Sequence, residues 1–280
     1  ILAVRFERIF MHPSIAFIGG GNMASALIGG LLKQGTPAAH IQVVEPFEEA
    51  RNRLQTQFGV RVLAEAGTPL TQADLVIWAV KPQVFKEATG PVASHTRGAL
   101  HLSVAAGIRS DSMAAWLGTE RIVRAMPNTP ALVGLGQTGL FARSAVTADD
   151  RARIESVIRS TGQFLWVNAE PLLDTVTAMS GSGPAYVFFF IEAMCRAGEA
   201  MGLSAEQAHQ LAVGTFVGAA ELARSSTESP AVLRQRVTSK GGTTYAAITA
   251  MEQAQMGPLF EKALEAARVR AVALGDEFGH

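Results

Sequence analysis

The stretch IAFIGGGNMASALI, residues 15–28, decides the fold of this chain. A short apolar run leads into three consecutive glycines, and helix-forming residues follow them. In the spacing Gly19-x-Gly21-x-x-Ala24, the first glycine makes a tight turn and the second lets the backbone approach a pyrophosphate. That pyrophosphate sits on the N-terminus of the following helix, and Ala24, in place of the third glycine, still permits close packing of this helix. The motif predicts a dinucleotide site that includes Gly19, Gly20, Gly21, Asn22, Met23 and Ala24.

Short apolar runs continue to about Asn168. The runs predicted to be strands are IAFIG, IQVVE, RVLA, DLVIWAV, ALHLSV, RIVRAM, QTGLF and FLWV, with helical patterns between the first of them. This alternation indicates a parallel sheet covered by helices on both faces. After Asn168 the strand signals stop and the segments have helical periodicity. The predicted fold class is therefore α/β, with a Rossmann-type dinucleotide-binding domain over residues 11–168 and an all-α domain over residues 169–280.

The helices predicted after residue 168 are rich in Ala, Gly and Met, and they are apolar around much of their circumference. A helix that is apolar on most sides is buried on most sides. Because this domain is small, we expect part of its apolar surface to contact another subunit. The helical domain is thus predicted to carry dimerisation.

Composition excludes several classes of protein. Among 280 residues, 48% are hydrophobic and 17% charged, which argues against disorder. Lys+Arg and Asp+Glu both number 24, so the neutral total argues against a dominant nucleic-acid role. The single cysteine excludes an intramolecular disulfide and a CxxC metal cluster, and favours the cytoplasm. No apolar run reaches membrane-spanning length. Residues 1–10, before Met11, are interpreted as a cloning leader or upstream read-through.

Further cofactor contacts are expected where the strands end, because ligands of such sheets lie at their carboxyl edge. Glu45 ends the second strand, where an acidic residue binds the adenosine ribose and favours NAD. Arg51 and Arg53 follow closely and could accept a 2′-phosphate, so NADH and NADPH both remain open. The other candidates at this edge are Ala79, Val80, Lys81, Pro82, Ala105, Ala106, Gly107 and Asn128.

The chain lacks an obvious proton donor for ketone reduction, which needs one to neutralise the alkoxide. Hydroxyacid dehydrogenases of similar build place a lysine on the first long helix after the nucleotide-binding domain. Here no lysine occurs between Lys86 and Lys240, and His209 lies within a helical pattern. A protonated imine needs no such donor, because hydride addition to its carbon leaves a neutral amine. The absence therefore points to C=N reduction.

A second glycine-rich turn, VTSKGGTTYAAI, begins at Val237 between two helical segments. Consecutive glycine amides followed by threonine at a helix start form a nest for an anion such as a carboxylate. Thr243 and Thr244 add hydroxyl groups that could bond a ring nitrogen. On its own, the turn could equally be the end of one helix followed by the cap of the next.

Several segments together resemble pyrroline-5-carboxylate reductases. They occur in the order FIGGGNMASALIGGL, AVKPQ, RAMPNTPALVGLG, TAMSGSGPAYVFFFIEAM, AGEAMGLSAEQAHQLAVGTFVGAAEL and VTSKGGTTYAAI. The resemblance extends from Met11 to the final helix, and SGSGPAY and GGTT are its most specific parts. It implies reduction of L-1-pyrroline-5-carboxylate to L-proline by NADPH or NADH, the last step of proline biosynthesis.

The resemblance also implies roles for individual residues. The amides of Gly241, Gly242 and Thr243 would bind the substrate carboxylate, and the Thr244 hydroxyl would meet the imine nitrogen. Residues 19–24, 79–82, 105–107 and Asn128 would hold the cofactor. The family forms a homodimer through its helical domain and often a larger ring of dimers.

The chain departs from the family pattern at three positions. Lys240 stands where proline is common, Tyr245 replaces an aliphatic residue, and Glu45 differs from the small or amide residues of members that prefer NADP. Two alternatives remain: a hydroxyacid dehydrogenase of similar build, disfavoured by the missing lysine, and a non-catalytic dinucleotide sensor. A sensor would have no need of the SGSGPAY and GGTT segments.

Overall fold

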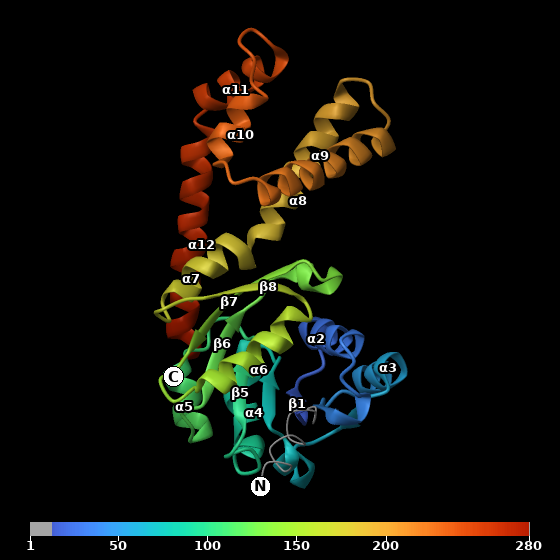
Figure 1. Ribbon diagram of the computed structural model, residues 1–280, viewed down its shortest axis with the longest axis vertical. Helices are drawn as coiled ribbons and strands as arrows, with labels where there is room; N and C mark the ends of the chain where they lie inside the picture. Colours follow the sequence, from blue (N-terminus) through green and yellow to red (C-terminus); the bar gives the residue numbers. More distant parts are fainter. Residues whose placement is uncertain (1–12, 280) are drawn as a thin grey trace, which may run out of the picture. The chain divides into compact units, whose positions relative to one another are not determined.

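The computed structural model describes residues 13–279 (Figure 1), so the leader assigned to residues 1–10 lies outside the described residues. The chain forms two compact units. The first contains the described residues up to Ser182 together with those from Ala267 onward. The second, the helical unit, is Gly183–Ala266.

The first unit is built on one eight-stranded sheet with the order β3-β2-β1-β4-β5-β6-β7-β8. Every strand expected from the sequence is present, and the order of the first six is that of a Rossmann dinucleotide-binding sheet. The strands are β1 Ile15–Ile18, β2 Ile41–Val44, β3 Arg61–Leu63, β4 Leu75–Trp78, β5 Leu100–Ser103, β6 Ile122–Met126, β7 Gly136–Ala142 and β8 Gly162–Trp166.

Strands β1 to β6 are parallel as predicted, but β7 departs from that arrangement by running antiparallel to β6. The connection between them holds only the short 3₁₀ helix η3, Thr129–Val133, and a parallel return would need a longer crossover. Strand β8 then pairs parallel with β7 after helix α6, Ala148–Arg159. The reversal at η3 places the start of β7 beside the end of β6.

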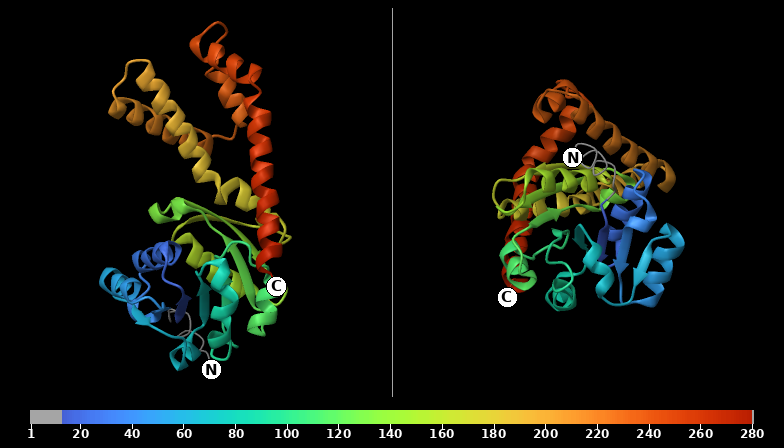
Figure 2. Two further views of the ribbon diagram at one scale, coloured as in Figure 1. Left: turned by 180° about the vertical axis from the view of Figure 1, so that it is seen from behind. Right: turned by 60° about the horizontal axis from the view of Figure 1, so that its bottom comes forward.

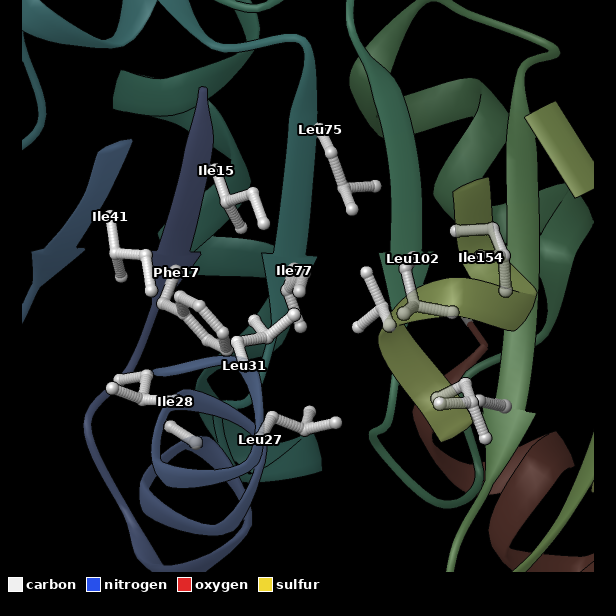
Figure 3. Close-up of a cluster of buried hydrophobic side chains, with 14 of the residues drawn as sticks. Ile15, Phe17, Leu27, Ile28, Leu31, Ile41, Leu75, Ile77, Leu102 and Ile154 are labelled. Atoms are coloured by element: carbon white, nitrogen blue, oxygen red, sulfur yellow. The ribbon is translucent and has the colours of Figure 1, made fainter. Parts of the chain in front are cut away.

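Alternate residues of each strand face opposite sides of the sheet, which gives two apolar cores. On one side, Ile15 and Phe17 of β1 pack with Leu27, Ile28 and Leu31 of helix α2 (Figure 3). Burial of each such side chain contributes about 1.5–3 kcal/mol. Helices α2 Asn22–Lys33, α3 Glu48–Phe58 and α6 contribute to this core.

The other core lies on the opposite face, where Ala16 and Ile18 pack with side chains of α4 Pro82–Ala93 and α5 Ser110–Leu117. Figure 1 is viewed from the α6 side of the sheet, and the left panel of Figure 2 shows the α4 side. The two short helices η1 Ala38–His40 and η2 Thr68–Gln72 complete the connections. Covering both faces explains why the central strands are almost wholly apolar.

Two short helical segments follow the last strand of the sheet. Helix α7, Leu172–Val176, continues directly into a five-residue π-helix, η4, Thr177–Gly181. Both belong to the first unit. The π-helix coincides with the sequence TAMSG, and nothing in its periodicity predicted it.

The remaining helices are α8 Gly183–Ala200, α9 Ala205–Ser225, α10 Pro230–Arg236, α11 Thr243–Gln253 and α12 Met256–Phe278. A Ser204–Gln207 capping box opens α9. Helices α8 and α9 pack together, and a Cβ atom at Gly198 would lie 3.0 Å from that of Ala208. The last part of α12, from Ala267, packs with the first unit. None of the described helices combines the length and apolarity needed to span a bilayer.

The helices of the second unit expose many large apolar side chains. Phe188 and Phe189 on α8 are 64% and 63% exposed, and Leu211 and Leu222 on α9 are 58% and 69% exposed. The sequence predicted apolar residues around most of each helix, and within one chain they lack cover. Such surface favours contact with another protein chain.

Candidate active site

The glycine turn after β1 meets the end of β4, as the sequence predicted for a nucleotide site. Gly19 has a φ of +94°, a conformation that favours glycine. A Cβ atom there would lie 2.7 Å from the Ala79 carbonyl oxygen and 2.9 Å from a Val80 methyl group. The residues 19–24 and 79–82 therefore come together at one edge of the sheet.

The start of α2 fits the pyrophosphate of a dinucleotide. Gly21 precedes the helix, provides no side-chain cap, and would have open space around a Cβ atom. The first turn contains no acidic residue. Unpaired amides at Asn22, Met23 and Ala24 can thus face an anion along the positive end of the helix dipole.

Glu45 lies at the end of β2, where the sequence placed it, but it is bonded within the protein. One carboxylate oxygen accepts the Gly20 amide at 2.8 Å, and the other accepts the Phe47 amide at 3.0 Å. The residue is 7% exposed. The carboxylate therefore fixes the glycine turn against the loop after β2, and each oxygen retains capacity for a further donor.

Two arginines of α3 bond to the backbone around Glu45 and the glycine turn. Arg51 donates to the carbonyl oxygens of Glu45 and Pro46 at 3.0 and 2.6 Å, and Arg53 donates to that of Gly20 at 3.2 Å. Their charges are not neutralised by these bonds. The ribose end of the site thus combines one fixed carboxylate with two guanidinium groups, and NADH and NADPH both remain possible.

The residues predicted after β4 and β5 lie at the same edge. Lys81 is exposed immediately before α4, which Pro82 begins. Ala105 is buried, and its amide donates to the Ser103 hydroxyl at 3.2 Å. Ala106 and Gly107 follow at intermediate exposure. Gly107 has a φ of +73°, and a Cβ atom there would lie 3.2 Å from Cβ of Leu274 on α12.

Asn128 also lies at this edge, but its side chain is occupied by protein groups. Its oxygen accepts the Gln137 amide at 2.9 Å, and its nitrogen donates to the Ser180 carbonyl and hydroxyl oxygens, both at 3.2 Å. The residue is 8% exposed. Two segments of the family resemblance, MPNTP and AMSGSG, therefore touch through Asn128 and the π-helix. Ser180 and Gly181 were not predicted as site residues, because no local pattern shows this contact.

A buried ion cluster secures the chain between β8 and α7. Arg124 on β6 donates to Glu170 at 2.7 Å, and the Ser110 amide and hydroxyl both reach the same carboxylate at 2.6 Å. Burial acts to raise the pKa of Glu170, but attraction to Arg124 and the hydrogen bonds from Ser110 hold that pKa below its ordinary value. Burial lowers the pKa of Arg124, against the effect of Glu170. This cluster is structural, since it fixes the segment that leads into the π-helix.

The second glycine turn lies in the helical unit. The Gly242 amide donates to the Ser239 carbonyl at 3.0 Å, which closes a four-residue turn. Gly241 occupies its third position with a φ of +77°, while Lys240 at the second position has no positive φ. This combination defines a type II turn, in which proline is favoured at the second position.

Helix α11 begins directly after that turn and has no side-chain cap at Gly242. Its first turn contains no acidic residue, so the amides of Thr243 and Thr244 can bind an anion. Thr244 is half-buried, and Tyr245 is 46% exposed. Of the amides predicted to form the nest, that of Gly242 is used by the turn itself, while that of Thr243 lies at the start of α11 next to the Thr244 residue.

Comparison with known proteins extends over nearly the whole chain. Residues 170–274 match the model of the pyrroline-5-carboxylate reductase dimerisation domain. Residues 14–107 match the model of the coenzyme F420-dependent NADP oxidoreductases. The pyrroline-5-carboxylate reductase of Pseudomonas aeruginosa is 44% identical over 271 residues, which cover 95% of this chain and 98% of the relative. That of Escherichia coli is 38% identical, covering 87% and 91%.

Solved structures agree with these sequence matches. A pyrroline-5-carboxylate reductase from Coxiella burnetii superimposes with a TM-score of 0.87 at 39% identity, covering 96% of this chain and 99% of that one. The pyrroline carboxylate reductase of Plasmodium falciparum, solved with NADP bound, gives a TM-score of 0.85 at 27% identity, covering 94% and 98%. The identity to several relatives over most of both chains leaves one conclusion: this chain belongs to the pyrroline-5-carboxylate reductase family.

Proposed function

We propose that this protein reduces L-1-pyrroline-5-carboxylate to L-proline with NADPH or NADH, the last step of proline biosynthesis. The observation that carries the proposal is the second glycine turn, which presents free amides of α11 beside the Thr244 hydroxyl. A dinucleotide-binding fold does not require such a turn. The family matches support the same reaction, since the relatives are named for this activity.

The cofactor is assigned to the carboxyl edge of the sheet. The amides of Asn22, Met23 and Ala24 would hold the pyrophosphate, and Glu45 with the neighbouring arginines would face the ribose. Residues 79–82 and 105–107 would line the remainder of the cofactor. When bound, the reduced nicotinamide supplies the hydride.

The substrate is assigned to the second glycine turn. The amides of Gly241 and Thr243 would bind its carboxylate, and the Thr244 hydroxyl would hydrogen-bond the imine nitrogen. The Gly242 amide, expected in the same role, already donates to the Ser239 carbonyl and closes the turn. Thr244 is the proposed catalytic residue, because it would contact the reacting C=N bond. The protonated imine already carries its proton, so the chain has to orient the carbon and exclude water without providing a general acid.

The protein is a homo-oligomer in this proposal, with residues 169–280 as the dimerisation and substrate domain. Support comes from the dimerisation model matching residues 170–274 and from the exposed apolar side chains of α8 and α9. A larger ring of dimers, as the family resemblance implies, is included in the proposal. We place the reaction in the cytoplasm.

The deciding experiment adds pyrroline-5-carboxylate to the purified protein with NADH or NADPH and follows cofactor oxidation by absorbance. Turnover with at least one cofactor is expected. A parallel assay with 2-oxo acids tests the hydroxyacid dehydrogenase alternative. Cofactor binding without turnover of any substrate would instead identify a dinucleotide sensor.

A further inference from the structure

The side-chain oxygen and nitrogen of Asn128 are both hydrogen-bonded within the protein, although the residue stands at the cofactor edge of the sheet. Its oxygen accepts the Gln137 amide at 2.9 Å, and its nitrogen donates to the Ser180 carbonyl and hydroxyl oxygens, both at 3.2 Å. Because the residue is also only 8% exposed, a direct contact with the cofactor would compete with these bonds for a side chain that is almost closed off from solvent.

The π-helix that Asn128 binds also fits closely against the end of β6, and α7 fits closely against the middle of β7. A Cβ atom at Gly181 would lie 2.4 Å from the Met126 terminal methyl group. Met126 pairs in register with Gly139, where an added Cβ atom would lie 2.8 Å from both methyl groups of Val176. Gly181 therefore lets the π-helix approach the end of β6, and Gly139 lets α7 approach β7. Asn128 then fixes the π-helix through its hydrogen bonds to Ser180.

The short helix η3, which follows Asn128, contacts the cofactor-binding helix α2. Asn128 immediately precedes η3, and η3 packs against α2, whose N-terminus is the proposed pyrophosphate site. The π-helix is thus joined through Asn128 and η3 to the helix that carries the glycine motif. π-Helical turns cost stability relative to α-helix and occur frequently at functional sites.

From these contacts we propose that Asn128 is a positioning residue. It holds the π-helix Thr177–Gly181 at the carboxyl edge of the sheet and does not itself bind the cofactor. The claim rests on the proposed function, since it assigns the π-helix to the region where the imine is reduced. Loss of Asn128 is then expected to impair turnover of the imine and to leave cofactor affinity unchanged.

The decisive variant is Asn128→Asp, which keeps an acceptor for the Gln137 amide but cannot donate to the Ser180 carbonyl. Asn168→Asp, an exposed site with the same charge change, is the matched control. Dissociation constants for NADPH and NADH are measured by fluorescence titration, kcat and KM by steady-state kinetics, and local opening by amide hydrogen exchange over residues 177–182.

For Asn128→Asp we expect kcat/KM for the imine to fall at least about tenfold, with faster exchange in residues 177–182 and cofactor affinity within about twofold of wild type. A cofactor dissociation constant that rises about tenfold, with unchanged exchange, would overturn the proposal and make Asn128 a direct ligand. If the wild-type protein does not reduce the imine, the proposed function fails, while binding and exchange still decide whether Asn128 positions the π-helix.

A second pair of variants guards against simple misfolding. Gly181→Ala should accelerate exchange in residues 177–182 and lower kcat, because its methyl group would meet Met126. Adding Met126→Ala removes the colliding atom and should restore both quantities at least in part. No restoration in the double variant would contradict the close fit on which the proposal depends.

Discussion

The Glu45 carboxylate accepts a hydrogen bond from the backbone amide of Gly20 at 2.8 Å, which joins the end of β2 to the glycine turn after β1. A second bond, from the Phe47 amide at 3.0 Å, completes its fixation. Glu45 therefore has a structural role in the turn besides any contact with the ribose. The two roles predict different effects on the two cofactors.

Glu45→Gln should destabilise the glycine turn after β1. One acceptor oxygen becomes an NH₂ group facing an amide donor, and a buried amide left without an acceptor costs about 1–3 kcal/mol. We expect a lower melting temperature and a higher KM for both NADH and NADPH. Glu49→Gln, exposed on the same segment, is the control and should change neither. An effect confined to NADH would show that ribose binding is the only role of Glu45.

Lys240→Pro should be tolerated. Lys240 occupies the second position of a type II turn, whose backbone proline already favours, so the change should stabilise the fold by about 0.4–1 kcal/mol. It also removes the positive charge beside the proposed carboxylate site. We expect kcat/KM for the imine to stay within about twofold of wild type, as it should for Lys240→Met. A large rise in the imine KM of both variants would assign the charge to substrate binding.

Thr244→Ala should lower kcat/KM for the imine at least about tenfold, because it removes the hydroxyl proposed to contact the reacting nitrogen. Thr244→Ser keeps that hydroxyl and should recover most of the activity. Thr249→Ala on the same helix serves as the control for helix stability. Steady-state kinetics with the imine provide the measurement, and an unchanged value for Thr244→Ala would remove Thr244 from the mechanism.

The loss of folding stability at acid pH should depend on His101. Its ring accepts the Trp78 indole hydrogen at 3.0 Å and contacts the Thr96 carbonyl at 3.2 Å, and burial lowers its pKa from 6.5 to about 4. Between these values the unfolded chain binds more protons than the folded chain, so stability falls as pH falls from 6.5 to 4. This loss amounts to about 3 kcal/mol.

The test compares urea unfolding of wild type and His101→Gln across that pH range. The variant should be less stable at pH 7 but should lose less stability on acidification. His209→Gln, on the exposed surface of α9, should follow wild type. Equal slopes for wild type and His101→Gln would contradict the assignment of a neutral buried imidazole.

Leu211→Lys should weaken self-association. Leu211 and Leu222 lie eleven positions apart, about three helical turns, so they share one exposed stripe of α9. A charge within a subunit contact would be buried without a partner. We expect light scattering to give a lower mass for Leu211→Lys than for wild type. Val84→Lys, which alters an exposed apolar residue on α4, should keep the wild-type mass. An unchanged mass for Leu211→Lys would exclude this stripe from the contact.

Local sequence patterns were sufficient for most of the fold. Each strand begins and ends within a few residues of its apolar run, and the capping boxes Thr147–Asp150 and Ser204–Gln207 each form within four consecutive residues. These features depend on side-chain periodicity and on hydrogen bonds within one turn of helix. The reversal of β7 was not predicted, since an apolar run carries no information about strand direction.

The candidate site was predicted less completely than the fold. Gly19, Ala79 and Val80 meet as the dinucleotide motif requires. The bonds of Asn128 with Ser180, 52 positions away, could not be inferred from either segment. The same limit applied to Glu45, whose bond to Gly20 bridges 25 positions.

The sequence by itself determined the dinucleotide-binding fold, the family and the two glycine turns, because glycine conformation and helix capping are properties of short segments. Only the tertiary structure decided what individual polar side chains do at the edge of the sheet. Glu45 and Asn128 have residue types suited to binding a cofactor, yet packing brings backbone amides and the Ser180 oxygens within hydrogen-bonding distance of them. A buried polar group must be paired, and its partner is set by the three-dimensional fold.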